Sequence, residues 1–172
     1  PNRRLPMILG ASMLALAPWL ALRLLLPLRP TSGFVMPRAF RGEDYREMRD
    51  DRARTDAFYE AIDSLAPGKL VLDLGTGALA LLAIRCARAG ARHVFAVEAM
   101  PQAAAEAQSA VRAAGLADRV TVLEGRSTEL ELPRRVDLVV HEVIGEIASR
   151  EGVALALRDA ALRHVKEEAV RR

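Results

Sequence analysis

The stretch KLVLDLGTG, residues Lys69–Gly77, decides the fold because it joins a short apolar run to a turn with two glycines. An apolar run of about four to eight residues that ends in glycine is typical of a strand buried in a parallel sheet. Similar runs recur along the chain, and we predict further strands over residues 93–98, 120–125 and 136–142.

Segments of helical character separate these runs. We expect helices over residues 78–91, 101–115 and 152–172, and an amphipathic helix within residues 43–66, before the first strand. Strands that alternate with helices predict an α/β protein with a Rossmann-like, doubly wound parallel sheet. Cys86 falls within the helical pattern of residues 78–91 and is expected to be a core residue.

The first 42 residues differ from the rest of the chain. No acidic residue precedes Glu43, whereas six arginines do, and residues 5–28 are apolar apart from Ser12 and Arg23. This segment predicts an apolar N-terminal helix, and about 20 such residues are enough to span a bilayer. Pro18, Pro27 and Arg23 oppose insertion, because proline and charged residues are costly inside hydrocarbon.

We therefore divide the chain into an apolar and basic segment with a linker, residues 1–42, and a folded core, residues 43–172. Residues 5–28 leave open a membrane contact, an organelle-targeting signal and a helix that packs on a partner. The core itself is expected in the cytoplasm.

Composition narrows the classes of function. The formal net charge of +3 is modest, and no basic stretch is interleaved with aromatic residues, so direct nucleic-acid binding is not expected. One cysteine and three scattered histidines predict neither a disulfide framework nor a metal site.

The candidate ligand-binding residues lie where the predicted strands end. In such a sheet, ligands lie beyond the carboxyl ends of the strands. The turn from Asp73 through Gly75 to Gly77 follows the first strand, and its glycines allow the backbone to approach a ligand. Glu98 closes the second strand, where a carboxylate can accept both hydroxyls of a ribose. These positions predict a nucleoside cofactor.

Two cofactors fit the glycine turn. The pattern Gly75-x-Gly77-x-x-Ala80 satisfies a loose dinucleotide fingerprint, so NAD is one alternative. A pyrophosphate would meet the carboxylate of Asp73, which is electrostatically unfavourable. S-adenosylmethionine lacks phosphate and carries an ammonium and a sulfonium group, so an acidic residue at the strand end favours this donor.

Three separated motifs resemble a known family. VLDLGTG (71–77), AGARHVFAVEA (89–99) and VDLVVHE (136–142) resemble the core of the class I methyltransferases. HEVIGEIASRE (141–151) is similar to the double-glutamate loop of the protein arginine methyltransferases, with Glu142 and Glu151 nine positions apart. YREMRDDRARTDAFYEAI (45–62) resembles the helix that covers the cofactor in that family.

The resemblance implies roles for individual residues. Arg54 would bind the carboxylate of the donor, and Met48 would pack near the transferred methyl group. Gly75 and Gly77 would line the methionine moiety, and Glu98 would hold the ribose. Glu142 and Glu151 would bind the guanidinium of a protein arginine.

Physical chemistry supports the last of these roles independently of the family. A guanidinium is planar and cationic, and its paired N–H groups match carboxylates. Two glutamates on one loop can neutralise its charge and orient one nitrogen toward a sulfonium.

Other functions stay open. A class I methyltransferase with another substrate and a non-catalytic cofactor-binding or scaffold module are the alternatives. The resemblance covers roughly residues 43–165 and does not reach the family's C-terminal barrel, so we expect an incomplete core. A sheet that ended at its fourth strand would expose an apolar edge, which leaves a dimer open.

Overall fold

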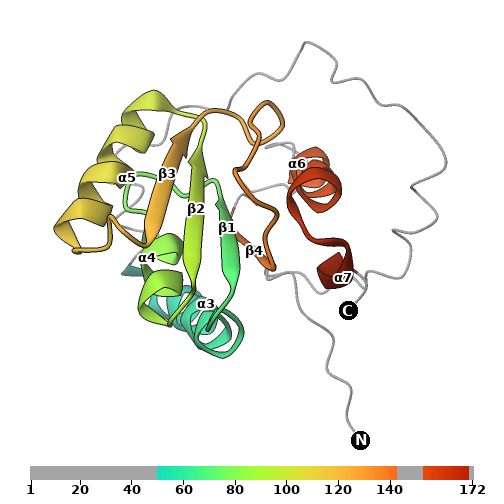
Figure 1. Cartoon of the computed structure of the whole chain (residues 1–172). Helices are drawn as coiled ribbons and strands as arrows, with labels where there is room; N and C mark the ends of the chain where they lie inside the picture. Colours follow the sequence, from blue (N-terminus) through green and yellow to red (C-terminus); the bar gives the residue numbers. More distant parts are fainter. Residues whose placement is uncertain (1–49, 143–152, 171–172) are drawn as a thin grey trace, which may run out of the picture.

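A computed structural model describes residues 50–142 and 153–170 (Figure 1). Its centre is a four-stranded sheet in the order β3-β2-β1-β4, and all three strand pairs are parallel. The strands are β1 (Leu70–Leu74), β2 (His93–Glu98), β3 (Val120–Glu124) and β4 (Leu138–His141). Each lies within a predicted run, so the parallel sheet expected from the sequence is confirmed.

Helices cover both faces of the sheet, as a doubly wound fold requires (Figure 1). One face packs against α3 (Arg52–Leu65), α4 (Leu81–Arg88) and α5 (Pro101–Ala113). The other packs against α6 (Val153–Asp159), the π-helix η1 (Ala160–His164) and α7 (Glu167–Val170).

Alternation along β1 separates the two cores. Val71 joins the core beneath α3, α4 and α5, whereas Leu70, Leu72 and Leu74 join the core on the side of η1. Successive strand residues point to opposite faces, so a strand that is apolar at nearly every position must be covered on both. Cys86 is fully buried in the first core, as predicted.

Local signals set the helix ends. The Asp51 side chain accepts a hydrogen bond from the Arg54 amide (3.3 Å) and caps α3. Pro101 occupies the first turn of α5, where a missing N–H is tolerated. Gly90 follows α4 with φ of 94°, a left-handed conformation that glycine adopts without strain.

The prediction of one helix over residues 152–172 is wrong. The segment consists of α6, η1 and α7, and Val165 between the last two is extended, with φ −93° and ψ 143°. Val165 forms a parallel bridge with Val136. The Val136 amide donates to the His164 carbonyl (2.7 Å), and the Lys166 amide donates to the Val136 carbonyl (3.0 Å). Pairing with Val136, which is distant in the chain, overrides the local helical preference at Val165.

Several expectations concern residues outside those that the structure describes. They are the apolar helix of residues 5–28, the donor contact of Met48 and the guanidinium contact of Glu151. Within residues 50–142 and 153–170, no helix is long and apolar enough to cross a bilayer.

Candidate functional site

The glycine turn after β1 is folded back over the end of β2. The amides of Gly75 and Thr76 both donate to the Val97 carbonyl, at 2.9 and 3.0 Å. Gly75 and Gly77 have φ of 77° and 66°, which only glycine adopts readily. Ala80, the residue before α4, also has a positive φ of 46°. The predicted glycine turn is therefore a tight structure at the carboxyl edge of the sheet.

The side chain of Asp73 stabilises this turn by hydrogen bonds. Its side chain is 1% exposed, and its Oδ2 atom accepts hydrogen bonds from the Thr76 hydroxyl (2.6 Å) and the Ala83 amide (3.0 Å). Ala83 lies in the first turn of α4, so the carboxylate satisfies an amide that the helix leaves unpaired. Among the described residues, its Oδ1 atom has no hydrogen-bond partner. Burial raises the pKa of Asp73 to about 7.

Glu98 connects the turn to the start of α5. One carboxylate oxygen accepts from the Gly77 amide and the other from the Met100 amide, both at 2.9 Å. The residue is 7% exposed. A carboxylate has about four acceptor positions, so two protein amides leave capacity for ligand hydroxyls.

The exit of β3 lies against Glu98. The Gly125 amide donates to the Glu98 carbonyl at 2.8 Å. Gly125 has φ of 139°, and a Cβ atom there would lie 3.1 Å from the Leu130 side chain. The backbone therefore requires glycine at this position, and the loop that follows begins beside the second strand end.

The predicted lid helix and the predicted substrate loop meet at an ion pair. Arg54 on α3 places Nη2 2.7 Å from Oε2 of Glu142, and each side chain is 30% exposed. Glu142 directly follows His141, whose register partner on β1 is Leu74. The structure therefore brings Arg54 and Glu142 to the strand edge that also carries the glycine turn.

Sequence reasoning missed part of this site. It assigned Asp73 and Glu98 to the ligand alone, whereas both carboxylates also bind backbone amides of the turn. Thr76 was a usable signal, because a hydroxyl three residues after a strand-end aspartate can donate back to it. His141 was also missed. It is 1% exposed, both ring nitrogens lack a partner among the described residues, and burial lowers its pKa to about 4.

Comparison with known proteins agrees with this geometry. Residues 71–168 match the family model described as a methyltransferase domain. A probable protein arginine N-methyltransferase 6 of Arabidopsis thaliana is 41% identical over 125 residues, which are 69% of this chain and 28% of that protein. The protein arginine N-methyltransferase PRMT10 of Oryza sativa subsp. japonica is 40% identical over 128 residues, 73% of this chain and 33% of that protein.

A solved structure has the same architecture. The crystal structure of Arabidopsis thaliana protein arginine methyltransferase 10 matches with a TM-score of 0.69 and 37% identity, over 74% of this chain and 37% of that one. The chain thus spans about a third of the length of the relatives that it matches. The matched family model, the parallel sheet and the turn with its two carboxylates lead to one conclusion: the chain belongs to the methyltransferase domain family, and within that family it resembles the protein arginine N-methyltransferases.

Proposed function

We propose that the chain is the core of an enzyme that transfers a methyl group from S-adenosylmethionine to the guanidinium of a protein arginine. One observation carries the proposal. Glu142 stands at the end of β4, at the edge of the sheet that carries the glycine turn, and its carboxylate already binds a guanidinium, that of Arg54, at 2.7 Å. The same carboxylate has the chemistry to bind a substrate arginine.

The residues around the turn fit the donor. Gly75 and Gly77 keep side chains away from the space above the turn, and Glu98 has acceptor positions left for the ribose hydroxyls. Asp73 holds the turn in shape through Thr76 and Ala83, and its ionised form favours a cationic ligand nearby. A structural relative, the Trypanosoma brucei PRMT1 enzyme-prozyme complex, was solved with AdoHcy (TM-score 0.66, 29% identity). The donor supplies a methyl group bound to a positively charged sulfur.

Arg54 and Glu142 exchange partners in the proposed reaction. Arg54 would hold the donor's carboxylate, and Glu142 would bind the substrate guanidinium, with Glu151 as the second carboxylate on the same loop. Glu142 orients the guanidinium so that one nitrogen faces the methyl carbon. The donor would supply its methyl carbon to that nitrogen, the electron pair of the carbon–sulfur bond would stay on sulfur, and the nitrogen would lose a proton. The carboxylate of Glu142, which would bind the guanidinium, is the proposed base for that proton.

The proposed partner is a protein with an accessible arginine. The matched relatives are named as protein arginine methyltransferases, which supports this choice of substrate. Self-association, cytoplasmic location and a membrane contact through residues 5–28 stay predictions from the sequence.

A pair of peptides tests the proposal. The chain is incubated with a donor that carries a labelled methyl group and with either an arginine-rich peptide or its arginine-to-lysine counterpart. We expect label in the arginine peptide only, because a single ammonium cannot match the two-point geometry of a carboxylate and a guanidinium. Equal labelling of both peptides would overturn the guanidinium role.

A further inference from the structure

Arg163, on η1, has a hydrogen-bond acceptor for every N–H group of its guanidinium. Its Nε and Nη2 atoms bind the two carboxylate oxygens of Asp159, at 2.8 and 2.7 Å. Nη1 donates to the Leu130 carbonyl (3.0 Å) and to Glu131 (2.8 Å), and Nη2 also donates to the Ser127 carbonyl (2.6 Å). A guanidinium has five N–H donors in a rigid plane, so all five are used.

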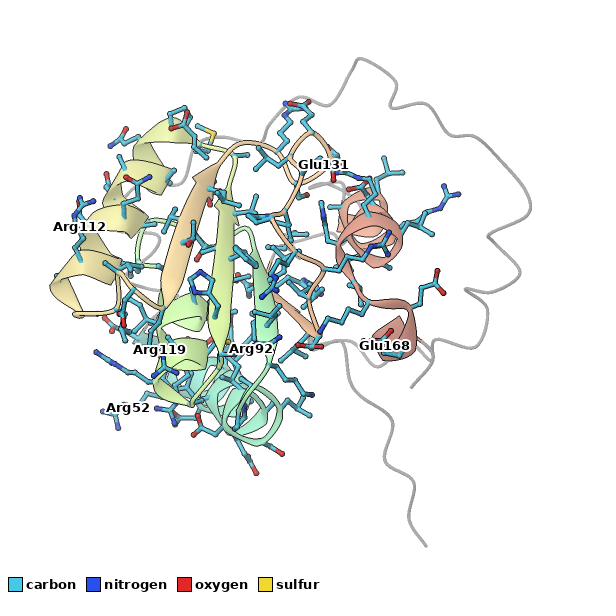
Figure 2. The ribbon with its side chains drawn as sticks, viewed as in Figure 1. Arg52, Arg92, Arg112, Arg119, Glu131 and Glu168 are labelled. Atoms are coloured by element: carbon cyan, nitrogen blue, oxygen red, sulfur yellow. The ribbon has the colours of Figure 1, made fainter. Side chains whose placement is uncertain are left out.

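The contacts come from two segments that are distant in the chain. Two are with Asp159, and two are with backbone carbonyls of the loop after β3. Asp159 ends α6, one turn before Arg163, and holds the guanidinium plane in place. The carbonyls of Ser127 and Leu130 belong to the loop after β3, 36 and 33 positions earlier in the chain. Figure 2 shows Glu131, the fifth acceptor, on this loop beside the helical segment of α6 and η1. Arg163 therefore fastens the loop after β3 to η1.

A second side chain reinforces the same contact. His164 is 2% exposed, and its Nε2 atom lies 3.0 Å from the Ser127 carbonyl. A carbonyl only accepts, so Nε2 carries the proton. Ser127 thus receives two donors from consecutive residues of η1, and its carbonyl is fixed in direction.

The fastened loop is part of the proposed donor site. It begins at Gly125, whose amide binds the Glu98 carbonyl, and Glu98 is the proposed ribose ligand. Ligands of such a sheet lie beyond the carboxyl ends of its strands, so we take the loop after β3 to flank the base of the donor. Arg163 binds the carbonyls of this loop from η1, so we assign it an effect on the donor that acts through the loop.

We propose that Arg163 is a positioning residue for the donor: by holding the Ser127 and Leu130 carbonyls, it sets the shape of the loop that lies beside the adenine. The inference rests on the proposed function and extends it, because it assigns donor affinity to a residue on η1. Lysine cannot replace it, since an ammonium has three donors at one point and cannot reach acceptors arranged around a plane.

The test compares Arg163→Lys with Arg85→Lys. Arg85 is a matched control because it also binds both oxygens of one aspartate, Asp63, but it joins α4 to α3 away from the loop. Calorimetry gives the affinity for S-adenosylhomocysteine, kinetics give KM for the donor, KM for the peptide and kcat, and thermal melting gives stability. Glu131→Ala, which removes only one exposed acceptor, is the variant least able to disturb folding.

We expect Arg163→Lys to weaken S-adenosylhomocysteine binding and raise the donor KM by about tenfold or more, because small misplacements of a binding loop are costly. The peptide KM and the kcat at saturating donor stay close to wild type. Glu131→Ala gives a smaller shift in the same direction, and Arg85→Lys gives none. A purely structural role would lower the melting temperature and the active fraction without moving either KM.

Three results overturn the inference. If Arg163→Lys and Glu131→Ala bind S-adenosylhomocysteine as tightly as wild type, the inference is contradicted. The proposed function is not affected by that result. An equal loss of affinity in Arg85→Lys would show that any loss of a bidentate pair has this effect. A wild-type chain that binds no S-adenosylhomocysteine would contradict the proposed function as well.

Discussion

Arg54 and Glu142 form an ion pair, with Nη2 of the arginine 2.7 Å from Oε2 of the glutamate. The pair joins α3 to the end of β4, so it links the predicted lid of the donor site to the predicted start of the substrate loop. Each partner is the residue that the family resemblance assigns to a different ligand. In the proposed function, this contact is the route by which donor binding would prepare the substrate site.

Replacement of Arg54 tests the donor side of this pair. We expect Arg54→Lys to raise the donor KM by about tenfold, since a charge-assisted hydrogen bond contributes about 1.5–3 kcal/mol and about 1.4 kcal/mol is a tenfold change. Initial rates at varied donor concentration measure the effect. Arg52→Lys, a change in an exposed residue of the same helix (Figure 2), is the control. The role of Arg54 is contradicted if both variants have the wild-type KM.

Replacement of Asp73 tests the cause of its raised pKa. The pKa is about 7 in the folded chain and 3.8 without burial, so the folded state favours the protonated form. Its contribution to the free energy of unfolding is therefore greatest below about pH 4 and is lost as pH rises through about 7. Asp73→Asn keeps an oxygen for Thr76 and Ala83, and we expect it to gain stability over wild type as pH rises across that range. Thermal melting at several pH values measures the difference, which would stay constant if Asp73 did not titrate.

His141 is predicted to give the free energy of unfolding the opposite dependence on pH. Burial lowers its pKa from 6.5 to about 4, so stability is fully present above 6.5 and is lost as pH falls through about 4. We expect His141→Leu to remove this loss and to raise the free energy of unfolding at neutral pH by about 1–3 kcal/mol, because a buried imidazole with no partner among the described residues disappears. Urea denaturation measures the change. A less stable variant would show that the imidazole makes a favourable contact.

Glu98 is predicted to support both the turn and the donor. Glu98→Gln replaces one acceptor oxygen by an amide that faces a backbone N–H, so we expect a loss of about 1–3 kcal/mol in stability together with weaker S-adenosylhomocysteine binding. Glu106→Gln is the control, because Glu106 is exposed on α5 and lies outside the proposed site. Melting curves with and without S-adenosylhomocysteine separate the two effects. Equal behaviour of the two variants would remove Glu98 from the donor site.

The strands could be predicted because their information is local. Val71, Leu72 and Leu74 form an apolar run that ends in glycine, and such a run has few alternatives in an α/β chain. The interruption of the last helix could not be predicted, since Val165 is extended through its pairing with Val136, which is far away in sequence.

The site likewise has a part that could be predicted from the sequence and a part that could not. Glycine positions and strand-end carboxylates are visible in the sequence, and they predicted the place of Asp73, Gly75 and Glu98. The contacts of Arg163 with the Ser127 and Leu130 carbonyls involve backbone atoms, which every residue possesses. No residue type in the loop signals them, so only the folded arrangement reveals them.

The most direct test of the account is the rate of methyl transfer to an arginine peptide by Glu142→Gln at saturating donor. Glutamine keeps the size of the side chain but removes the charge that binds a guanidinium. Glu106→Gln, a change at an exposed position of α5, is the control. We predict that Glu142→Gln lowers kcat/KM for the peptide by at least about tenfold, while the affinity for S-adenosylhomocysteine stays within about twofold of wild type. Transfer at the wild-type rate by Glu142→Gln would contradict the account.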